Sequence, residues 1–466
     1  MVFSSIPFLY YFLPVTLLLY FIMPKRLRNG LLLLASLVFY AWGEPRFVIM
    51  MAVAILQGYL FGILIEKSEN RGSKKLFLTL SVLLSLGILG YFKYADFFIE
   101  SFNAATGLSI PLLRVTLPVG ISFFTFQILS YVVDVYRGDA PAQRNLVNLA
   151  AYIAMFPQLI AGPIVRYSDI AAQLKERDYS LEKCAVGIRR FVIGLGKKVL
   201  IANALGELCT IFKTSGDKSV LFFWLYAVSY TIHVYFDFSG YSDMAIGLGK
   251  IMGFQFLENF NYPYISRSVT EFWRRWHMSL GTWFRDYVYI PLGGNRVSRG
   301  RWLLNIMVVW VCTGFWHGAA WTFMAWGGLF GVLLIIEKLW LGKLLEKSKP
   351  LSHVYVMVVV ILSFVIFDSG SLKEAWQVIS AMFGAGVYPL VSPEALYYLK
   401  SYLVLLLVGA IGATPLVSHC VRRLGETGVG HRTFWLLEPL FLLLVLLTAT
   451  AYIVDGSFNP FLYFRF

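Results

Sequence analysis

Charged side chains are scarce in this sequence. Asp, Glu, Lys and Arg make up only 14% of the 466 residues, whereas hydrophobic residues make up 58%. A soluble globular domain carries about 25% charged residues, so this chain lacks the polar surface that such a domain needs. No low-complexity linker and no separate soluble segment interrupts the apolar runs. The composition therefore predicts an all-α, polytopic integral membrane protein with a single membrane-embedded domain over residues 1–466.

Cysteine is also rare, which excludes two kinds of site. The four cysteines are far apart, with no Cys-x-x-Cys pair and no histidine spacing typical of zinc. We therefore expect neither disulfides nor a bound metal. A Gly-x-Ser-x-Gly nucleophile motif is absent as well. Gly247, Gly249 and Gly253 do not have the spacing of a dinucleotide-binding loop, and close packing between helices explains them better.

The net charge of +14 does not indicate a nucleic-acid-binding protein. The basic residues lie in short loops between apolar runs, which is the positive-inside pattern of membrane proteins. This pattern places residues 25–28, 66–75 and 237–301 in the cytoplasm and both termini outside. The apolar runs predict about twelve membrane-spanning helices, give or take two. The first of them is a retained helix, since no signal-peptide cleavage site follows it.

Two segments depart from this simple pattern. Residues 149–165 are apolar but contain Pro157, Gly162 and Pro163, which predicts a broken or re-entrant element buried in protein. Residues 237–301 are polar, aromatic and rich in arginine. Within them, side chains at spacings of three and four predict one amphipathic helix at the cytoplasmic boundary of the membrane: Phe272, Trp276, Leu280, Trp283, Phe284 and Tyr287.

His317 is the first candidate catalytic residue. It lies in an otherwise apolar stretch, and an ionisable group at membrane depth is a functional-site hypothesis by default. A buried imidazole stays neutral and can accept a proton, as general-base catalysis requires. The alternative is a histidine that only bonds a neighbouring helix. Gly314 and Gly318 favour the catalytic role, because glycines allow a substrate to approach closely.

His277 is the second candidate, although its place beside Trp276 on the amphipathic segment also fits an interfacial role. Arg274, Arg275 and Arg285 could bind the phosphates of an acyl-coenzyme A, or could serve only as topology signals. Asp237 and Asp243 are expected to form structural ion pairs with the arginines of the following segment.

Four blocks of the sequence resemble the membrane-bound O-acyltransferase family, in particular its alginate O-acetyltransferase branch. The first combines residues 1–14 with 36–43, and the second combines 117–127 with 156–163. The third runs from 235 to 295 and includes Glu271-Phe-Trp-Arg-Arg-Trp-His277. The fourth is Phe315-Trp-His-Gly-Ala319. The blocks occur in the same order as in the family and span most of the chain.

The resemblance implies that His317 is the family's catalytic histidine and that acetyl-coenzyme A, or another acyl thioester, is the cytoplasmic donor. No cofactor would be bound permanently. The acceptor would be a polysaccharide outside a bacterial cytoplasmic membrane, and a separate extracytoplasmic acetyltransferase would complete the transfer.

A teichoic-acid D-alanyl transferase is a rival, but Arg274 stands where those enzymes typically have asparagine. A non-catalytic transporter is disfavoured because no inverted repeat is visible. His233, where glutamine is usual, and Phe367-Asp, where Phe-Arg is usual, depart from the family pattern.

Overall fold

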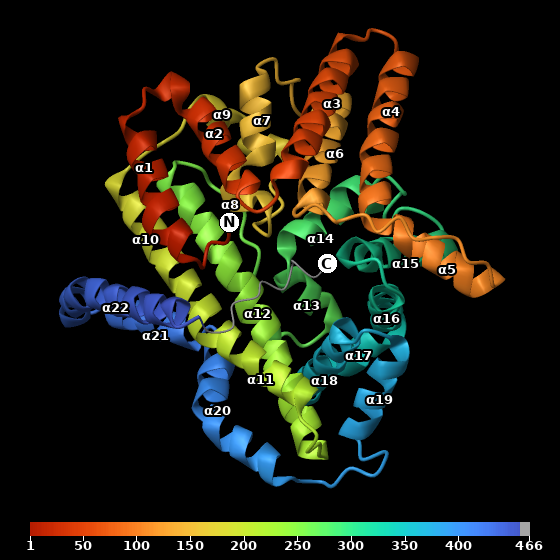
Figure 1. Ribbon diagram of the computed structural model, residues 1–466, viewed down its shortest axis with the longest axis vertical. Coiled ribbons are helices and arrows are strands. Elements are labelled where there is room, and N and C mark those ends of the chain that lie inside the picture. Colours follow the sequence, from red (N-terminus) through yellow and green to blue (C-terminus); the bar gives the residue numbers. More distant parts are fainter. Residues whose placement is uncertain (457–466) are drawn as a thin grey trace. The chain divides into compact units, whose positions relative to one another are not determined.

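The computed structural model describes residues 1–456, and within them the regular structure is helical, with no β-strand (Figure 1). The all-α prediction is therefore confirmed. The chain forms two compact units. The first comprises Met1–Phe191 and Met244–Leu257, and the second comprises Val192–Asp243 and the residues from Glu258 onward. Two of the three boundaries fall inside helices, α10 (Leu181–Gly196) and α12 (Val220–Ile251), and the third lies in the loop after α12.

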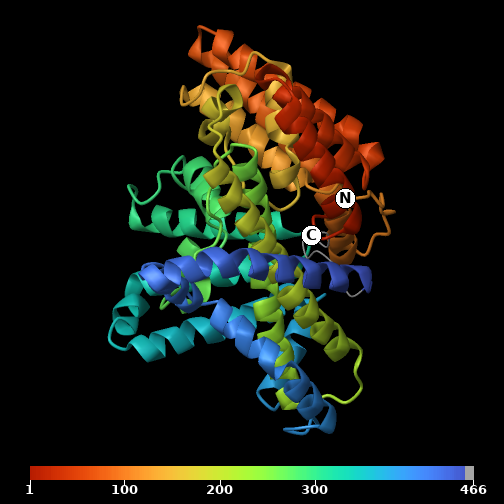
Figure 2. The ribbon, with the colours of Figure 1, turned by 90° about the vertical axis from the view of Figure 1, so that its left-hand side faces the viewer.

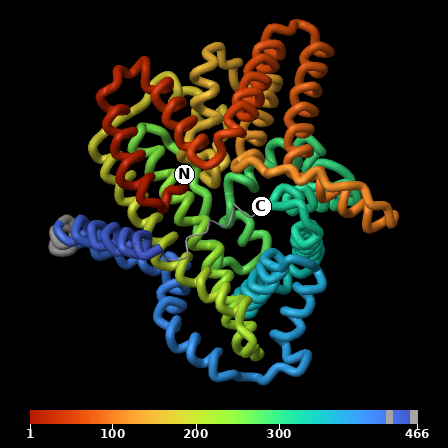
Figure 3. The backbone as a smooth tube through the Cα atoms, viewed as in Figure 1, coloured from red at the N-terminus to blue at the C-terminus, as the bar shows by residue number. Residues whose placement is uncertain are grey.

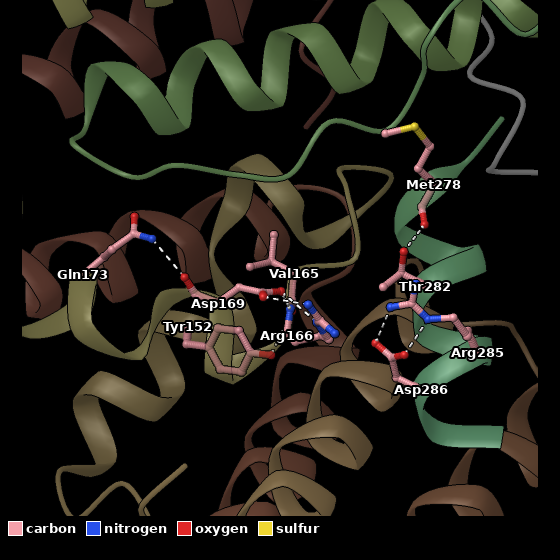
Figure 4. Close-up of polar contacts among 9 residues, drawn as sticks. All are labelled: Tyr152, Val165, Arg166, Asp169, Gln173, Met278, Thr282, Arg285 and Asp286. Carbon is pink, nitrogen blue, oxygen red and sulfur yellow. Dashed lines mark hydrogen bonds and ion pairs between the residues drawn. The ribbon is translucent and has the colours of Figure 1, made fainter. Parts of the chain in front are cut away.

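The first unit is built from short and long helices joined by brief turns. Ahead of α10 they are η1 (Pro7–Phe12), α1 (Leu13–Ile22), η2 (Lys25–Leu27), α2 (Arg28–Ala41), η3 (Pro45–Phe47), α3 (Val48–Lys67), α4 (Arg71–Leu89), η4 (Gly90–Tyr94), α5 (Ala95–Thr106), α6 (Ile121–Arg137), α7 (Leu146–Ala154), α8 (Phe156–Leu159) and α9 (Tyr167–Lys175). Helices α3, α4 and α6 pack against one another. The start of α9 is held by Asp169, which pairs with the Arg166 guanidinium at 2.9 Å (Figure 4).

The second unit contains the remaining elements. They are η5 (Lys197–Asn203), α11 (Ala204–Thr214), most of α12, η6 (Pro263–Ile265), α13 (Val269–Arg275), α14 (Met278–Phe284), η7 (Arg285–Tyr289), α15 (Arg299–His317), α16 (Trp321–Ile336), η8 (Glu337–Leu341), α17 (Gly342–Leu345), α18 (Lys349–Asp368), α19 (Leu372–Met382), α20 (Pro393–Gly412), α21 (Leu416–Gly425) and α22 (Gly428–Val454). Helices α21 and α22 lie side by side (Figure 2).

In the second unit α15 and α16 form a closely packed hairpin, which can be followed in the teal part of the tube in Figure 3. A side chain at Gly314 would collide with the carbonyl oxygen of Phe323, and one at Gly327 would collide with that of Trp310. Glycine at both positions lets the two backbones approach closely, as at small-residue crossings of membrane helices. The same reason holds at Gly247 in the first unit, where an added Cβ would lie 2.6 Å from the Gly187 carbonyl oxygen. The packing explanation for that glycine is confirmed.

Six helices in the described part of the chain are long and apolar enough to cross a membrane. They are Pro45–Lys67, Arg71–Thr106, Val220–Ile251, Lys349–Asp368, Pro393–Gly412 and Leu436–Val454. Pro7–Ile22 is apolar but shorter. The polar segment that the sequence places in the cytoplasm from Asp237 onward begins inside a helix, because α12 continues to Ile251. The helix tolerates the Asp237 carboxylate because Lys198 neutralises it at 2.5 Å.

The predicted break within residues 149–165 is confirmed. Helix α7 ends at Ala154, Met155 leaves the helical conformation, and α8 has only four residues. All side chains from Leu149 to Val165 are buried, and Tyr152 donates a hydrogen bond to the Val165 carbonyl at 2.9 Å (Figure 4). Irregular backbone of this kind is thereby shielded by protein.

Candidate functional site

The aromatic segment after Ser268 is two short helices and not the single amphipathic helix that its spacing predicts. Helix α13 ends at Arg275 and α14 begins at Met278, with His277 between them at φ 45° and ψ 52°. This left-handed conformation is unusual for a residue with a Cβ. It is held by backbone hydrogen bonds to the preceding loop, from Asn261 N to Arg275 O and from Met278 N to Asn259 O, each 2.9 Å. Periodicity could not reveal this tertiary pairing.

The apolar face of this segment is covered by protein and does not form a membrane-surface stripe. Phe272 and Trp276 belong to the core of the second unit, together with Tyr264. The Phe272 and Trp276 rings stack with centroids 5.6 Å apart, and Trp276 stacks on Tyr264 at 6.1 Å. The stacked rings fix the position of the chain just before His277.

A cavity of about 540 Å³ opens beside the α13–α14 break. Its size falls within the range of small-molecule sites. Aromatic and apolar side chains form most of its wall, with threonine hydroxyls and three cations among them. The lining residues are Thr270, Trp273, Arg274, His277, Met278, Leu280, Gly281, Thr282, Phe284, Arg285, Tyr289, Ile306, Val309, Trp310, Thr313, Leu334 and Lys338.

Three of the five residues predicted to form the site line this cavity: His277, Arg274 and Arg285. Arg285 forms a bidentate pair with Asp286, at 2.7 and 3.1 Å (Figure 4). Arg274 forms no ion pair with any side chain that the structure describes (residues 1–427 and 436–456). Arg275 is not among the lining residues; its guanidinium binds Glu271 at 3.0 Å and the Asn261 carbonyl at 3.1 Å.

Lys338 is a third cavity cation, which sequence reasoning missed. It lies in η8, directly after the apolar run of α16, and its Nζ is 6.0 Å from the centre of the Trp302 ring. No ion pair involves it in the part of the chain that the structure describes. The available signal was the pair Glu337-Lys338 just after an apolar run, which a topology argument explains equally well.

His277 is buried, with 1% of its surface exposed. Its Nδ1 is 3.1 Å from Asn259 Oδ1, and its ring meets Phe238 and Trp316 edge to face, at 4.6 and 5.9 Å. Burial, and after it the charge of His317, holds the pKa of His277 well below its usual range. The imidazole is therefore neutral at physiological pH.

His317 ends α15 and is also buried, with 5% of its surface exposed. Three aromatic rings surround it, with centroids 5.0 Å (Trp316), 5.1 Å (Trp326) and 5.4 Å (Phe367) away. Phe367 is the residue whose following Asp departs from the family pattern. The departure thus lies next to the imidazole that the resemblance identifies as catalytic.

The glycines beside His317 have a packing role. A Cβ at Gly318 would collide with the Phe323 ring, and Gly314 contacts the backbone of α16. They make room for the neighbouring helix, and this packing by itself accounts for glycine at both positions. The location of His317 on its helix is informative instead. Ile306, Trp310 and Thr313 line the cavity at spacings of three and four, and His317 continues the same helix face one turn later.

The two aspartates of α12 are ion-paired, but their partners are lysines and not the arginines expected from the sequence. Lys198 Nζ lies 2.5 Å from Asp237 Oδ1, and Lys197 Nζ lies 2.7 Å from Asp243 Oδ2. Both lysines lie in the π-helical turn η5. His233, on the same helix as the aspartates, has its Nδ1 2.6 Å from the Ala202 carbonyl.

Comparison with known proteins places this geometry in context. Residues 137–368, which include the cavity and both histidines, match the membrane-bound O-acyltransferase family. The chain is 47% identical over 396 residues to a probable alginate O-acetylase of Azotobacter vinelandii, covering 84% of this chain and 79% of that protein.

Two relatives match along nearly their whole length. A probable alginate O-acetylase of Pseudomonas putida is 41% identical over 490 aligned positions, covering 100% of both chains. A peptidoglycan O-acetyltransferase of Helicobacter pylori is 32% identical, covering 100% of this chain and 98% of that protein.

Proposed function

Because the chain belongs to the membrane-bound O-acyltransferase family, we propose that it takes acetyl from cytoplasmic acetyl-coenzyme A and passes it across the membrane for O-acetylation of a cell-surface polysaccharide, alginate first among the acceptors. The chain is a multi-pass membrane O-acyltransferase. The observation that carries the choice of acetyl transfer and alginate is the 41–47% identity to probable alginate O-acetylases over most of the chain.

His317 acts as the general base in this proposal. Its neutral imidazole accepts the proton of the acceptor hydroxyl, and the hydroxyl oxygen forms a bond to the thioester carbonyl carbon. The carbon–sulfur bond then breaks, with its electron pair going to sulfur, and the proton returns to the thiolate. Atoms and charges balance without a metal or a redox partner. The aromatic rings around His317 support this role because they shield the imidazole from water.

The cavity beside His277 binds the donor. Arg274 and Lys338 are exposed cations at its wall without ion-pair partners in the described residues, and the phosphates of coenzyme A would neutralise them. Arg285 contributes a third positive charge, whereas Arg275 is already engaged by Glu271. The apolar wall formed by Trp273, Trp310 and other side chains suits the thioester arm.

We further propose that residues 1–466 work as one acyltransferase domain in a bacterial cytoplasmic membrane, because the Pseudomonas putida relative aligns with the entire chain. About twelve crossings would include shorter or broken helices such as Pro7–Ile22 in addition to the six long ones. A separate extracytoplasmic acetyltransferase would complete transfer to the polymer.

The orientation in the membrane follows from the basic loops, with both termini outside and the loop around Asn70 in the cytoplasm. Asn70 is exposed at the start of α4, so a cysteine at this position is reachable. In a cysteine-free background, an impermeant thiol reagent should label it only after the membrane is opened. Labelling in intact cells would show that this loop lies outside, opposite to the proposed orientation.

Substitution of His317 tests the catalytic proposal. His317→Ala should lower acetyl transfer by about 10²–10⁴-fold, the usual effect of losing a general base. His317→Gln keeps a polar side chain that cannot accept the proton, so it should be equally inactive. The assay is acetyl incorporation into the polymer, normalised to the amount of each variant in the membrane. Near-normal acetylation by the Gln variant would leave His317 with a packing role only.

A further inference from the structure

The buried side chain of Asn259 determines which nitrogen of His277 carries a proton. Asn259 has 1% of its surface exposed, and its side chain forms hydrogen bonds with Ser242, His277 and Ser279. The backbone N–H of Ser279 lies 3.3 Å from its Oδ1, and the Ser279 hydroxyl lies 2.9 Å from the same atom. A backbone N–H can only donate, so the amide atom that faces it must be the oxygen. On the opposite side, Nδ2 donates to the Ser242 hydroxyl at 3.0 Å.

This orientation of the amide fixes the tautomer of the imidazole. The same Oδ1 lies 3.1 Å from His277 Nδ1, and an oxygen that accepts requires a proton on that nitrogen. A neutral imidazole has only one ring proton. Nε2 therefore has a free lone pair and is the proton-accepting atom of the ring.

The lone pair on His277 Nε2 accepts no hydrogen bond from the described part of the chain. Nε2 is buried and has no hydrogen-bond partner there. Buried polar atoms are normally hydrogen-bonded, so an exception calls for an explanation. His277 lines the cavity that contains Arg274 and Lys338, and it has the backbone strain that is common at functional sites. A substrate group in the cavity would supply the missing hydrogen bond.

The two histidines are neighbours of the same aromatic ring. The Trp316 ring contacts both, with centroids 5.9 Å from His277 and 5.0 Å from His317. A charge on His317 lowers the pKa of His277, so the two rings are not both charged at neutral pH. Of the two, only His277 is among the residues that line the donor cavity.

We propose that Asn259 is a positioning residue that holds His277 protonated at Nδ1, so that Nε2 receives the proton from His317 and delivers it to the departing thiolate. The acceptor O–H bond breaks at His317, the carbon–oxygen bond forms, and the carbon–sulfur bond breaks. The proton then moves from His317 to His277 Nε2 and on to sulfur. This inference rests on the proposed acetyl transfer. It assigns to His277 the protonation of the thiolate that leaves the acetyl donor.

Asn259→Asp is the sharpest test, because the new carboxylate still accepts from Nδ1 but adds a negative charge. That charge stabilises the imidazolium and raises the pKa of His277. His277 accepts a proton only when neutral, so kcat/KM falls as the pH drops through this pKa. In the Asp variant the acidic fall of kcat/KM for coenzyme A release should move to higher pH, by roughly one unit or more. A profile that superimposes on the wild type would overturn the proposal.

Asn259→Ala provides the second kinetic arm. It removes the acceptor for Nδ1, so kcat should fall by about 10–100-fold, the usual effect of removing a partner that orients a functional histidine. KM for acetyl-coenzyme A should be unchanged, because Asn259 does not line the cavity. Ser242→Ala is the matched control, since it removes the partner of Nδ2 and leaves the Oδ1 contacts in place. Equal losses in both variants would indicate a structural role only.

Nitrogen NMR of ¹⁵N-histidine-labelled protein in detergent gives a readout that does not depend on activity. The His277 signals, identified by their loss in His277→Gln, should report a protonated Nδ1 and a bare Nε2. The opposite tautomer would overturn the assignment of Asn259 even if acetyl transfer stands. Full activity of His317→Gln would instead refute the proposed base, whatever tautomer His277 has. The two proposals therefore fail in distinguishable ways.

Discussion

The second unit contains two sets of basic side chains with opposite surroundings. Lys198 in η5 is 1% exposed and touches the equally buried Asp237. Arg274 and Lys338, in contrast, are exposed at the wall of the cavity, and no carboxylate pairs with them in the described residues. The first set is neutralised inside the protein, and the second is available to an anion from outside.

This difference separates basic residues that hold the fold from those that can bind a ligand. A buried cation without its counter-ion is strongly unfavourable, so Lys198 and Asp237 depend on each other. An exposed cation is hydrated and needs no partner for folding. Arg274 and Lys338 at the cavity wall are therefore available to bind a phosphorylated substrate. The same reasoning separates Arg275, bound by Glu271, from its neighbour Arg274.

The largest effect is expected where the buried pair is broken. Lys198→Met should destabilise the protein by roughly 3–5 kcal/mol, because it leaves the Asp237 carboxylate buried without a counter-ion. The measurement is the unfolding midpoint of the purified protein in detergent, with membrane expression recorded alongside.

Two variants control for this result. Combining Lys198→Met with Asp237→Leu removes both charges and should recover most of the lost stability. Lys197→Met should destabilise less, because the Lys197–Asp243 pair is partly exposed. If the double variant is less stable than the single one, the pair has a role beyond charge balance. Neutralisation of charge would then not be what distinguishes Lys198 from the cavity cations.

A smaller effect, confined to substrate binding, is expected at the cavity. Arg274→Ala and Lys338→Ala should each raise KM for acetyl-coenzyme A about tenfold, since a hydrogen bond to a charged group contributes roughly 1.5–3 kcal/mol. The unfolding midpoint should stay at the wild-type value because neither side chain has an internal ion pair to lose.

Arg275→Ala is the matched control for the cavity variants. Its guanidinium binds Glu271 and the Asn261 carbonyl, so its loss should lower stability slightly and leave KM close to normal. Normal donor KM in both Arg274→Ala and Lys338→Ala would show that these cations serve membrane topology and that the donor phosphates bind elsewhere.

Much of the candidate site could be located from the sequence because the signals are local. His317 stands out as an ionisable residue in an apolar run, and Arg274 and Arg285 lie in a segment too polar to span a membrane. Three of the five predicted residues line the cavity. Lys338 was missed because a lysine just after an apolar run has the same local appearance whether it marks topology or binds a ligand.

The amino-acid sequence by itself determined the helical membrane class, the family and the chemical types of the candidate site residues, because composition and ordered motifs are properties of the linear chain. The tertiary structure alone decided the break at His277, the space that Gly314 leaves for α16, and the lysine partners of the α12 aspartates. Each of these depends on atoms brought together from distant parts of the chain. Helical periodicity carries no information about such contacts, whereas packing and the burial of charge determine them.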